Sequence, residues 1–158
     1  MKSLVVYDSM FGNTEKIANE IGRYLGRETK VLSVGKVNKD DIGKLDLLVV
    51  GSPTHGGRPT DVITKFINTI PRNLKVVFFD TRFEKSEQGF GLKILLSVIG
   101  FATEKMERQF GILGGKVFTE SMGFIVTDKE GPIKKGEMER LKNWVEKIRS
   151  KLKVLMVK

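Results

Sequence analysis

Short apolar runs alternate along this chain with stretches in which apolar residues recur at helical spacing. Five runs are mostly continuous rather than alternating, which is typical of strands buried on both faces of a sheet. They span residues 4–7, 30–34, 47–50, 76–79 and 117–126. Strands separated by helical stretches predict an α/β fold in which helices cover both faces of a parallel sheet.

The stretches between these runs predict helices with one buried face. The expected buried positions are Ile17, Ile21, Tyr24 and Leu25 in the first helix, Val62, Ile63, Phe66, Ile67 and Ile70 after Pro59–Thr60, and Met138, Leu141, Val145, Ile148 and Leu152 in a last helix that opens near Gly136. A short helix is expected over residues 40–45, and a long one over 92–110 that ends before Gly114–Gly115. Because no linker or repeat interrupts the pattern, residues 1–158 are expected to form one domain.

The composition excludes several kinds of chemistry. The 158 residues contain no cysteine and a single histidine. Disulfides, thiol nucleophiles, iron–sulfur clusters and multi-histidine zinc sites are therefore excluded. The sequence shows no secretory signal and no apolar run long enough for a membrane span, so a cytoplasmic protein is expected.

The charge is basic and unevenly distributed. The formal net charge is +9, and residues 134–158 hold nine Lys or Arg and three Glu, a net of +6. A basic C-terminal face predicts an acidic partner, with nucleic acid as the weaker option. The alternative is a solvated helix surface without a partner.

The loop after the first predicted strand has the features of a phosphate site. Residues 9–14 read Ser-Met-Phe-Gly-Asn-Thr and lead directly into a helix. Unpaired backbone N–H groups and the positive dipole end of a helix favour a phosphate. Ser9 and Thr14 can add hydroxyls, Asn13 can donate an amide, and Gly12 allows close approach. The alternative is an ordinary capped turn, and the sequence contains neither GxxxxGK[ST] nor GxGxxG.

This loop resembles the FMN-phosphate loop of the flavodoxin family, [TS]-x-T-G-x-T. Ser9, Gly12 and Thr14 match the motif, Met10 and Asn13 fill its open positions, and Phe11 replaces its middle threonine. The resemblance implies a three-layer α/β/α sandwich with a five-stranded parallel sheet in the order 2-1-3-4-5. It also implies FMN as the cofactor.

The loop after the third strand is similar to the flavodoxin loop that lines one side of the flavin ring. The resemblance assigns to it Pro53, Thr54, His55, Gly56 and Gly57. The two glycines can adopt backbone conformations that other residues avoid, which is useful where a peptide turns against a flat ring. The alternative for His55 is a surface histidine without a ligand.

The loop after the fourth strand resembles the family loop that covers the other face and edge of the ring. Phe83 is the expected stacking aromatic, and the backbone of Asp80 and Thr81, with Arg82, is expected at the ring's polar edge. Asp80 and Arg82 are alternatively a structural ion pair. The Trp–Tyr sandwich common in the family is missing, because Trp144 lies in the last predicted helix.

The resemblance implies an electron-transfer flavoprotein whose FMN supplies the chemistry. Its expected partner is a redox protein, acidic because this chain is basic. The alternatives are an NAD(P)H-dependent FMN quinone-type oxidoreductase and a flavin-free binding module of the same fold. Two apolar segments suggest further contacts: a homo-oligomer through the helix around residues 92–101, and docking of the tail at 153–158.

Overall fold

A five-stranded parallel sheet forms the centre of the computed structural model, which describes residues 1–83 and 100–157. The strands are β1 (Ser3–Tyr7), β2 (Thr29–Ser33), β3 (Leu47–Pro53), β4 (Val76–Phe83) and β5 (Met122–Val126). Their order across the sheet is β2-β1-β3-β4-β5, and all neighbouring pairs are parallel. The predicted order is confirmed, and β3 and β4 run three and four residues further than the predicted strands.

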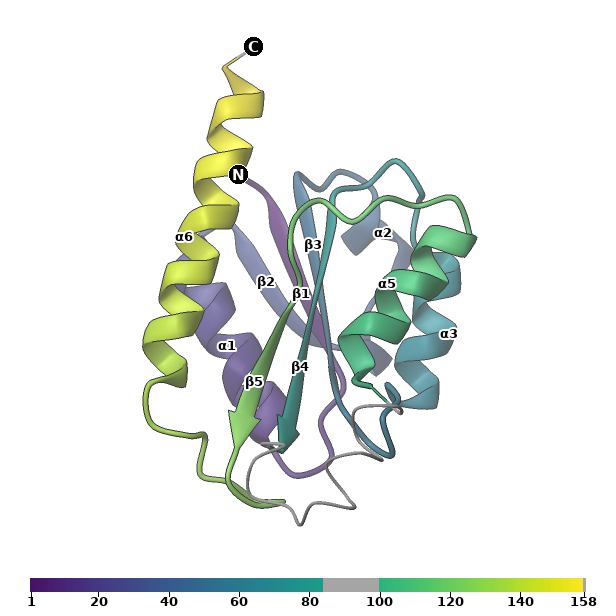
Figure 1. The fold of residues 1–158 in the computed structure, drawn as a ribbon. Coiled ribbons are helices and arrows are strands. Elements are labelled where there is room, and N and C mark those ends of the chain that lie inside the picture. The colour runs from purple at the N-terminus through teal and green to yellow at the C-terminus, as the bar shows by residue number, and fades with distance from the viewer. Residues whose placement is uncertain (84–99, 158) are drawn as a thin grey trace.

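Helices cover both faces of the sheet, which gives the predicted three layers (Figure 1). One face packs against α1 (Asn13–Leu25) and α6 (Glu137–Met156), and the other against α3 (Asp61–Thr69) and α5 (Ala102–Ile112). The short helices η1 (Val34–Lys36) and α2 (Lys39–Ile42) follow β2.

Alternate residues of the central strands contribute to two separate cores, as the two-residue period of a strand requires. Val49 and Phe79 face α1 and α6, whereas Val50 and Phe78 face α3 and α5. These four side chains are fully buried. This explains why the strands read as continuous apolar runs rather than alternating ones.

The helix predicted over 92–110 does not extend continuously to residue 110. The chain is extended at Phe101, Gly100 has φ +74°, and α5 begins only at Ala102. A positive φ cannot belong to a right-handed helix, so the turn at Gly100 separates α5 from what precedes it. Residues 92–99, with most of the predicted oligomer contact, lie outside the described residues.

The strand predicted over 117–126 is also shorter than expected. Val117 forms an isolated bridge with Val76, and regular pairing with β4 starts only at Met122. Between them Phe118 N–H still donates to the Val76 carbonyl, but the Phe78 N–H of β4 donates to the Ser121 hydroxyl and the Glu120 carbonyl accepts from the Trp144 indole at 2.8 Å. Regular backbone pairing is therefore interrupted before Met122.

Two predicted core positions, Val62 and Met138, are exposed, although both fit the helical period. Trp144, in contrast, is buried and packs against Phe124, with 5.9 Å between the ring centroids. The tail extends beyond the sheet at the end of α6 (Figure 1), and Val157 is 87% exposed, so the predicted docking of the tail stays a prediction. No helix in the described parts of the chain is long and apolar enough to cross a bilayer.

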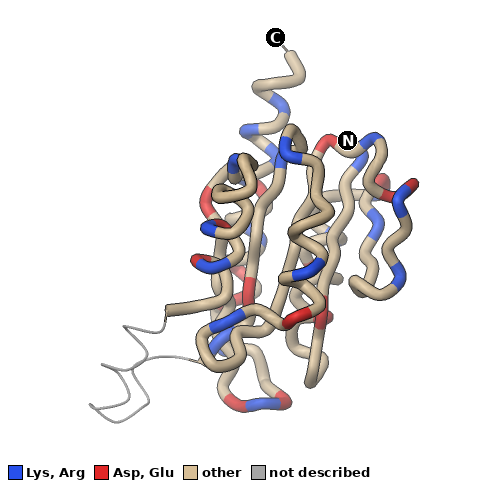
Figure 2. Tube along the Cα trace, turned by 90° about the vertical axis from the view of Figure 1, so that its right-hand side faces the viewer, with Lys and Arg blue, Asp and Glu red and all other residues tan. Residues whose placement is uncertain are grey.

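The positive charge near the C-terminus lies on the second half of α6. After Glu146 this helix carries Lys147, Arg149, Lys151 and Lys153 without a carboxylate (Figure 2). Two of these side chains serve the fold, because Arg149 donates to the Tyr24 carbonyl at 3.1 Å and Lys151 to the Phe118 carbonyl at 2.6 Å. The acidic partner predicted for this face stays a prediction.

We expect Gly51→Ala to destabilise the sheet. A Cβ at Gly51 would lie 2.0–2.5 Å from the ring of the fully buried Phe79, which has no room to move. Such overpacking costs about 1–3 kcal/mol of unfolding free energy. Urea denaturation measures the loss, with Gly111→Ala in α5 as control, because nothing lies within 4 Å of its added Cβ. Equal stability of the two variants would contradict the packing described.

We also expect a raised pKa for the phenol of Tyr7, because it is partly buried and donates a hydrogen bond to the Glu15 carboxylate at 2.9 Å. The folded state then holds this proton more tightly than the unfolded state. Its contribution to stability is complete below about pH 10 and is lost as the pH rises through the folded pKa. Absorbance titration of a Tyr24→Phe variant follows Tyr7 alone. A further Glu15→Gln substitution lowers the midpoint, and an unchanged midpoint would refute the assignment.

Candidate functional site

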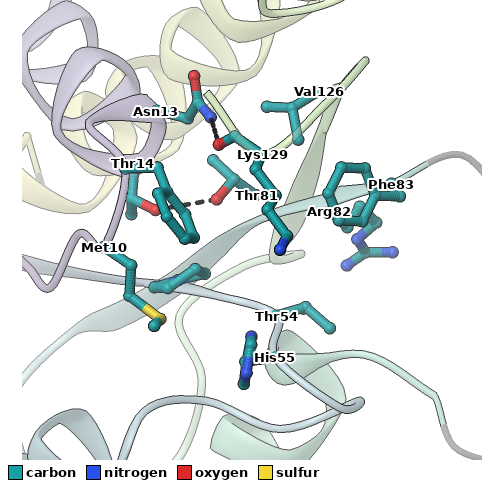
Figure 3. A pocket seen from close by; sticks show the side chains of 12 residues that line it. Met10, Asn13, Thr14, Thr54, His55, Thr81, Arg82, Phe83, Val126 and Lys129 are labelled. Carbon is teal, nitrogen blue, oxygen red and sulfur yellow. Dashed lines mark hydrogen bonds between the residues drawn. The ribbon is translucent and has the colours of Figure 1, made fainter. Parts of the chain in front are cut away.

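A hollow opens at the carboxyl ends of β1, β3, β4 and β5 (Figure 3). Ligands bind at this edge of open parallel sheets. The hollow spans about 640 Å³ when the solvent space at its open mouth is included. It is lined by Met10, Phe11, Asn13, Thr14, Pro53, Thr54, His55, Thr81, Arg82, Phe83, Val126 and Lys129.

The first wall of the hollow is the start of α1. Gly12, at φ +90°, is the N-cap residue, and its N–H donates to Ser9 Oγ at 3.0 Å. The first helical hydrogen bond runs from Lys16 N–H to the Gly12 carbonyl, so the N–H groups of residues 13–15 precede the helical pattern and have no partner within it. The backbone thus supplies donors and the positive end of the helix dipole, which favour an anion.

Asn13 lines the hollow, and its Nδ2 donates one hydrogen bond to the Lys129 carbonyl at 2.7 Å, which ties the start of α1 to the loop after β5. A contact of its amide with a phosphate stays a prediction. Ser9 accepts a bond from Gly12 and does not line the hollow. Thr14 does line it, and its hydroxyl lies 2.9 Å from that of Thr81 in β4.

The loop after β3 turns tightly at its two glycines. His55 and Arg58 exchange two backbone hydrogen bonds of 2.9 and 3.0 Å, and Gly56 and Gly57 have φ +55° and +74°. Positive φ at both central positions is the pattern of a type I′ turn. The predicted special conformations are therefore confirmed, although His55 lines the hollow and the glycines do not.

Thr54 joins this loop to its neighbours. Its N–H donates to the Thr81 carbonyl at 2.9 Å, and its hydroxyl accepts from the Ala102 N–H at 2.9 Å. The hydroxyl therefore satisfies a backbone donor in the first turn of α5. The loop after β3 is thus fixed to both β4 and α5.

Asp80 forms a structural ion pair, the alternative that the sequence also allowed, while the role predicted for its backbone at the ring's edge stays a prediction. It is fully buried in β4, does not line the hollow and forms a two-armed ion pair with Arg82 at 2.6 and 2.7 Å. It also accepts from the Thr103 N–H, and Arg82 donates to the Thr103 hydroxyl. The Arg82 guanidinium stacks 3.7 Å above the Phe101 ring. A Cβ at Gly123 would meet this guanidinium at 2.1 Å, so the glycine makes room for it.

Three large apolar side chains stand at the rim of the hollow. Met10, Phe11 and Phe83 are 52%, 48% and 39% exposed. Exposed aromatic faces beside a hollow are suited to contact a flat ring. Phe83 thus lies where the predicted stacking residue should lie, and that role stays a prediction.

Sequence reasoning missed Val126 and Lys129, which line the hollow from the end of β5 and the loop after it. The predicted topology could have indicated these two residues, because the segments that follow parallel strands meet at one edge of the sheet. Lys129 lies three residues past the end of the fifth strand.

The lining combines apolar side chains with hydrogen-bonding groups and includes one imidazole, that of His55. None of the described lining residues is an Asp or Glu, and the described residues include no cluster of three His, Asp or Glu that could hold a metal. The arrangement combines an anion-binding helix start with apolar walls. It can hold a flat molecule that carries a phosphate.

Comparisons with known proteins agree with this geometry. An archaeal flavodoxin structure superposes with a TM-score of 0.73 at 20% identity, covering 97% of this chain and 99% of that one. The rubredoxin:oxygen oxidoreductase of Desulfovibrio gigas matches with a TM-score of 0.66 at 21% identity, covering 99% of this chain but 37% of the larger protein. At these identities the likeness shows the fold alone.

Two curated relatives match at higher identity over shorter segments. A flavodoxin of Aquifex aeolicus is 37% identical over 73 residues, which are 44% of this chain and 40% of that protein. An uncharacterized protein of Methanocaldococcus jannaschii is 36% identical over 83 residues, 51% of this chain and 54% of its own. The chain thus spans about half the length of the curated relatives it matches.

The family comparison covers most of the chain. The flavodoxin domain matches residues 4–146, from β1 to the middle of α6. This range includes all five strands except Ser3 at the start of β1, and all residues that line the hollow. The chain therefore belongs to the flavodoxin domain family.

Proposed function

We propose that this chain binds FMN in the hollow and serves as an electron carrier. The observation that carries the proposal is the meeting of the α1 start with an apolar-walled hollow at one sheet edge. The phosphate would accept hydrogen bonds from the N–H groups of residues 13–15 and from the Thr14 hydroxyl. Bound FMN supplies reversible acceptance of electrons.

The residues around the hollow fit a flat ring beside that phosphate. His55 comes from the loop after β3 and Phe83 from the end of β4, and the apolar side chains of Met10 and Phe11 stand at the rim. Their role would be to orient the ring and to limit its contact with water. An electron carrier of this kind needs no acid or base of its own, because the bound FMN accepts and passes on the electrons.

We expect Gly12→Ala to weaken FMN binding through its phosphate. The added Cβ meets nothing within 4 Å, so the effect arises from the φ of +90°, which alanine disfavours. Displacement of the turn at Gly12, before α1, raises the Kd of FMN about tenfold, which equals about 1.4 kcal/mol of binding free energy. Riboflavin, which lacks the phosphate, is affected much less. Titration calorimetry with both ligands measures the change.

Gly136→Ala is a matched control for this experiment. Gly136 is the N-cap of α6 at φ +93°, also has open space around an added Cβ, and does not line the hollow. Both variants lose a similar amount of folding stability, but only Gly12→Ala loses FMN affinity. Equal FMN affinity in the two variants would contradict a phosphate site at α1, and wild-type protein that fails to bind FMN would contradict the proposed function.

A carrier is distinguished from a quinone-type oxidoreductase by its turnover. We expect the FMN-loaded protein, once reduced with dithionite, to pass electrons to ferricyanide. With NADH or NADPH and a quinone it consumes no reduced nucleotide above the rate of free FMN. Absorbance at 340 nm follows that consumption, and steady turnover there would favour the oxidoreductase instead.

A further inference from the structure

Lys129 gives the hollow a positive charge that no described lining residue neutralises. Arg82 also lines the hollow, but its guanidinium forms an ion pair with Asp80 at 2.6 Å. Asp and Glu are absent from the described lining, and no described residue forms an ion pair with Lys129. The charge therefore acts on whatever fills the hollow.

The backbone of Lys129 is held in place independently of its side chain. Its carbonyl accepts from Asn13 Nδ2 at 2.7 Å, and its N–H donates to the Asp128 side chain at 2.7 Å. The surrounding loop is closed by hydrogen bonds from Thr127 N–H to the Pro132 carbonyl and from Gly131 N–H to the Asp128 carbonyl, both of 3.0 Å. A side-chain substitution at Lys129 leaves all of these bonds intact.

The side chain of Lys129 extends from this anchored backbone into the hollow. Figure 3 shows it starting beside Asn13 and reaching toward Thr54, away from the first turn of α1. The anion donors of α1 and the Lys129 ammonium thus serve different parts of the hollow. Thr54 belongs to the loop that carries His55, on the side where the proposed function puts the flavin ring.

We propose that Lys129 makes this hollow bind two-electron-reduced FMN more tightly, relative to oxidised FMN, than it otherwise would. This inference rests on the proposed function. Two electrons from an external reductant and one proton, taken up at N5, convert the neutral ring into a ring with one negative charge. A nearby ammonium attracts that added charge, and the attraction is strong where apolar walls reduce the surrounding water. Lys129 is therefore a residue that tunes the potential of the bound cofactor.

The test compares Lys129→Gln, Lys129→Arg and Lys135→Gln in the full chain. Lys135 is an exposed lysine of the same connection between β5 and α6 and does not line the hollow, so its variant controls for loss of one positive charge. The Kd of oxidised FMN is measured by quenching of its fluorescence. Dithionite titration gives the midpoint potential of bound FMN against free FMN, and the two together give the Kd of the reduced form.

We expect Lys129→Gln to raise the Kd of reduced FMN about tenfold more than that of oxidised FMN. A tenfold change corresponds to a drop of about 30 mV in the two-electron midpoint potential. Lys129→Arg keeps the charge and most of the wild-type potential, and Lys135→Gln keeps all of it.

Three outcomes would overturn the inference. Equal weakening of both oxidation states, with riboflavin unaffected, would show that Lys129 contacts the phosphate. An unchanged potential in Lys129→Gln would show that the ammonium does not reach the ring, and an equal drop in Lys135→Gln would assign the effect to overall charge. Failure of the wild-type protein to bind oxidised FMN would instead reject the proposed function, so the two failures are distinguishable.

Discussion

The site depends on the backbone donors at the start of α1, which precede the first helical hydrogen bond and point toward the sheet edge. Gly12 allows this because it holds φ +90° immediately before the helix. These donors need no charged side chain to attract an anion, since the helix dipole supplies positive charge at the same place. The backbone donors on which the proposed phosphate site depends are therefore kept although Phe11 stands where the family motif has its middle threonine.

Hydrogen bonds between segments distant in the sequence fix the other walls of the hollow relative to the start of α1. Thr14 meets Thr81, Asn13 meets the Lys129 carbonyl, and Thr54 meets both Thr81 and Ala102. Each bond joins segments that are far apart in the sequence. A binding site fixed in this way orients its ligand without further ordering when the ligand arrives, which favours affinity.

The features that depend on neighbouring residues in the sequence were predicted correctly. The five strands and the positive-φ turn at Gly56–Gly57 follow from apolar runs and turn chemistry, and the strand order followed from the family resemblance of residues 9–14. What the sequence did not indicate involves partners distant in the chain. Asn13 Nδ2 donates to a carbonyl 116 residues away, a contact that no local pattern predicts. The strand expected from 117 pairs regularly only from Met122, since the Phe78 N–H of β4 donates to the Ser121 hydroxyl and the Glu120 carbonyl accepts from Trp144 of α6. Lys129 has no distinctive local pattern, and only the strand order brings its loop beside α1.

A crystal structure of the protein with FMN tests the central claim most directly. The account predicts phosphate oxygens within about 2.7–3.2 Å of the N–H groups of residues 13–15, with the ring between the loop that follows β3 and the end of β4. A phosphate bound elsewhere, or a corner at Gly12 filled by the Phe11 side chain, would contradict it.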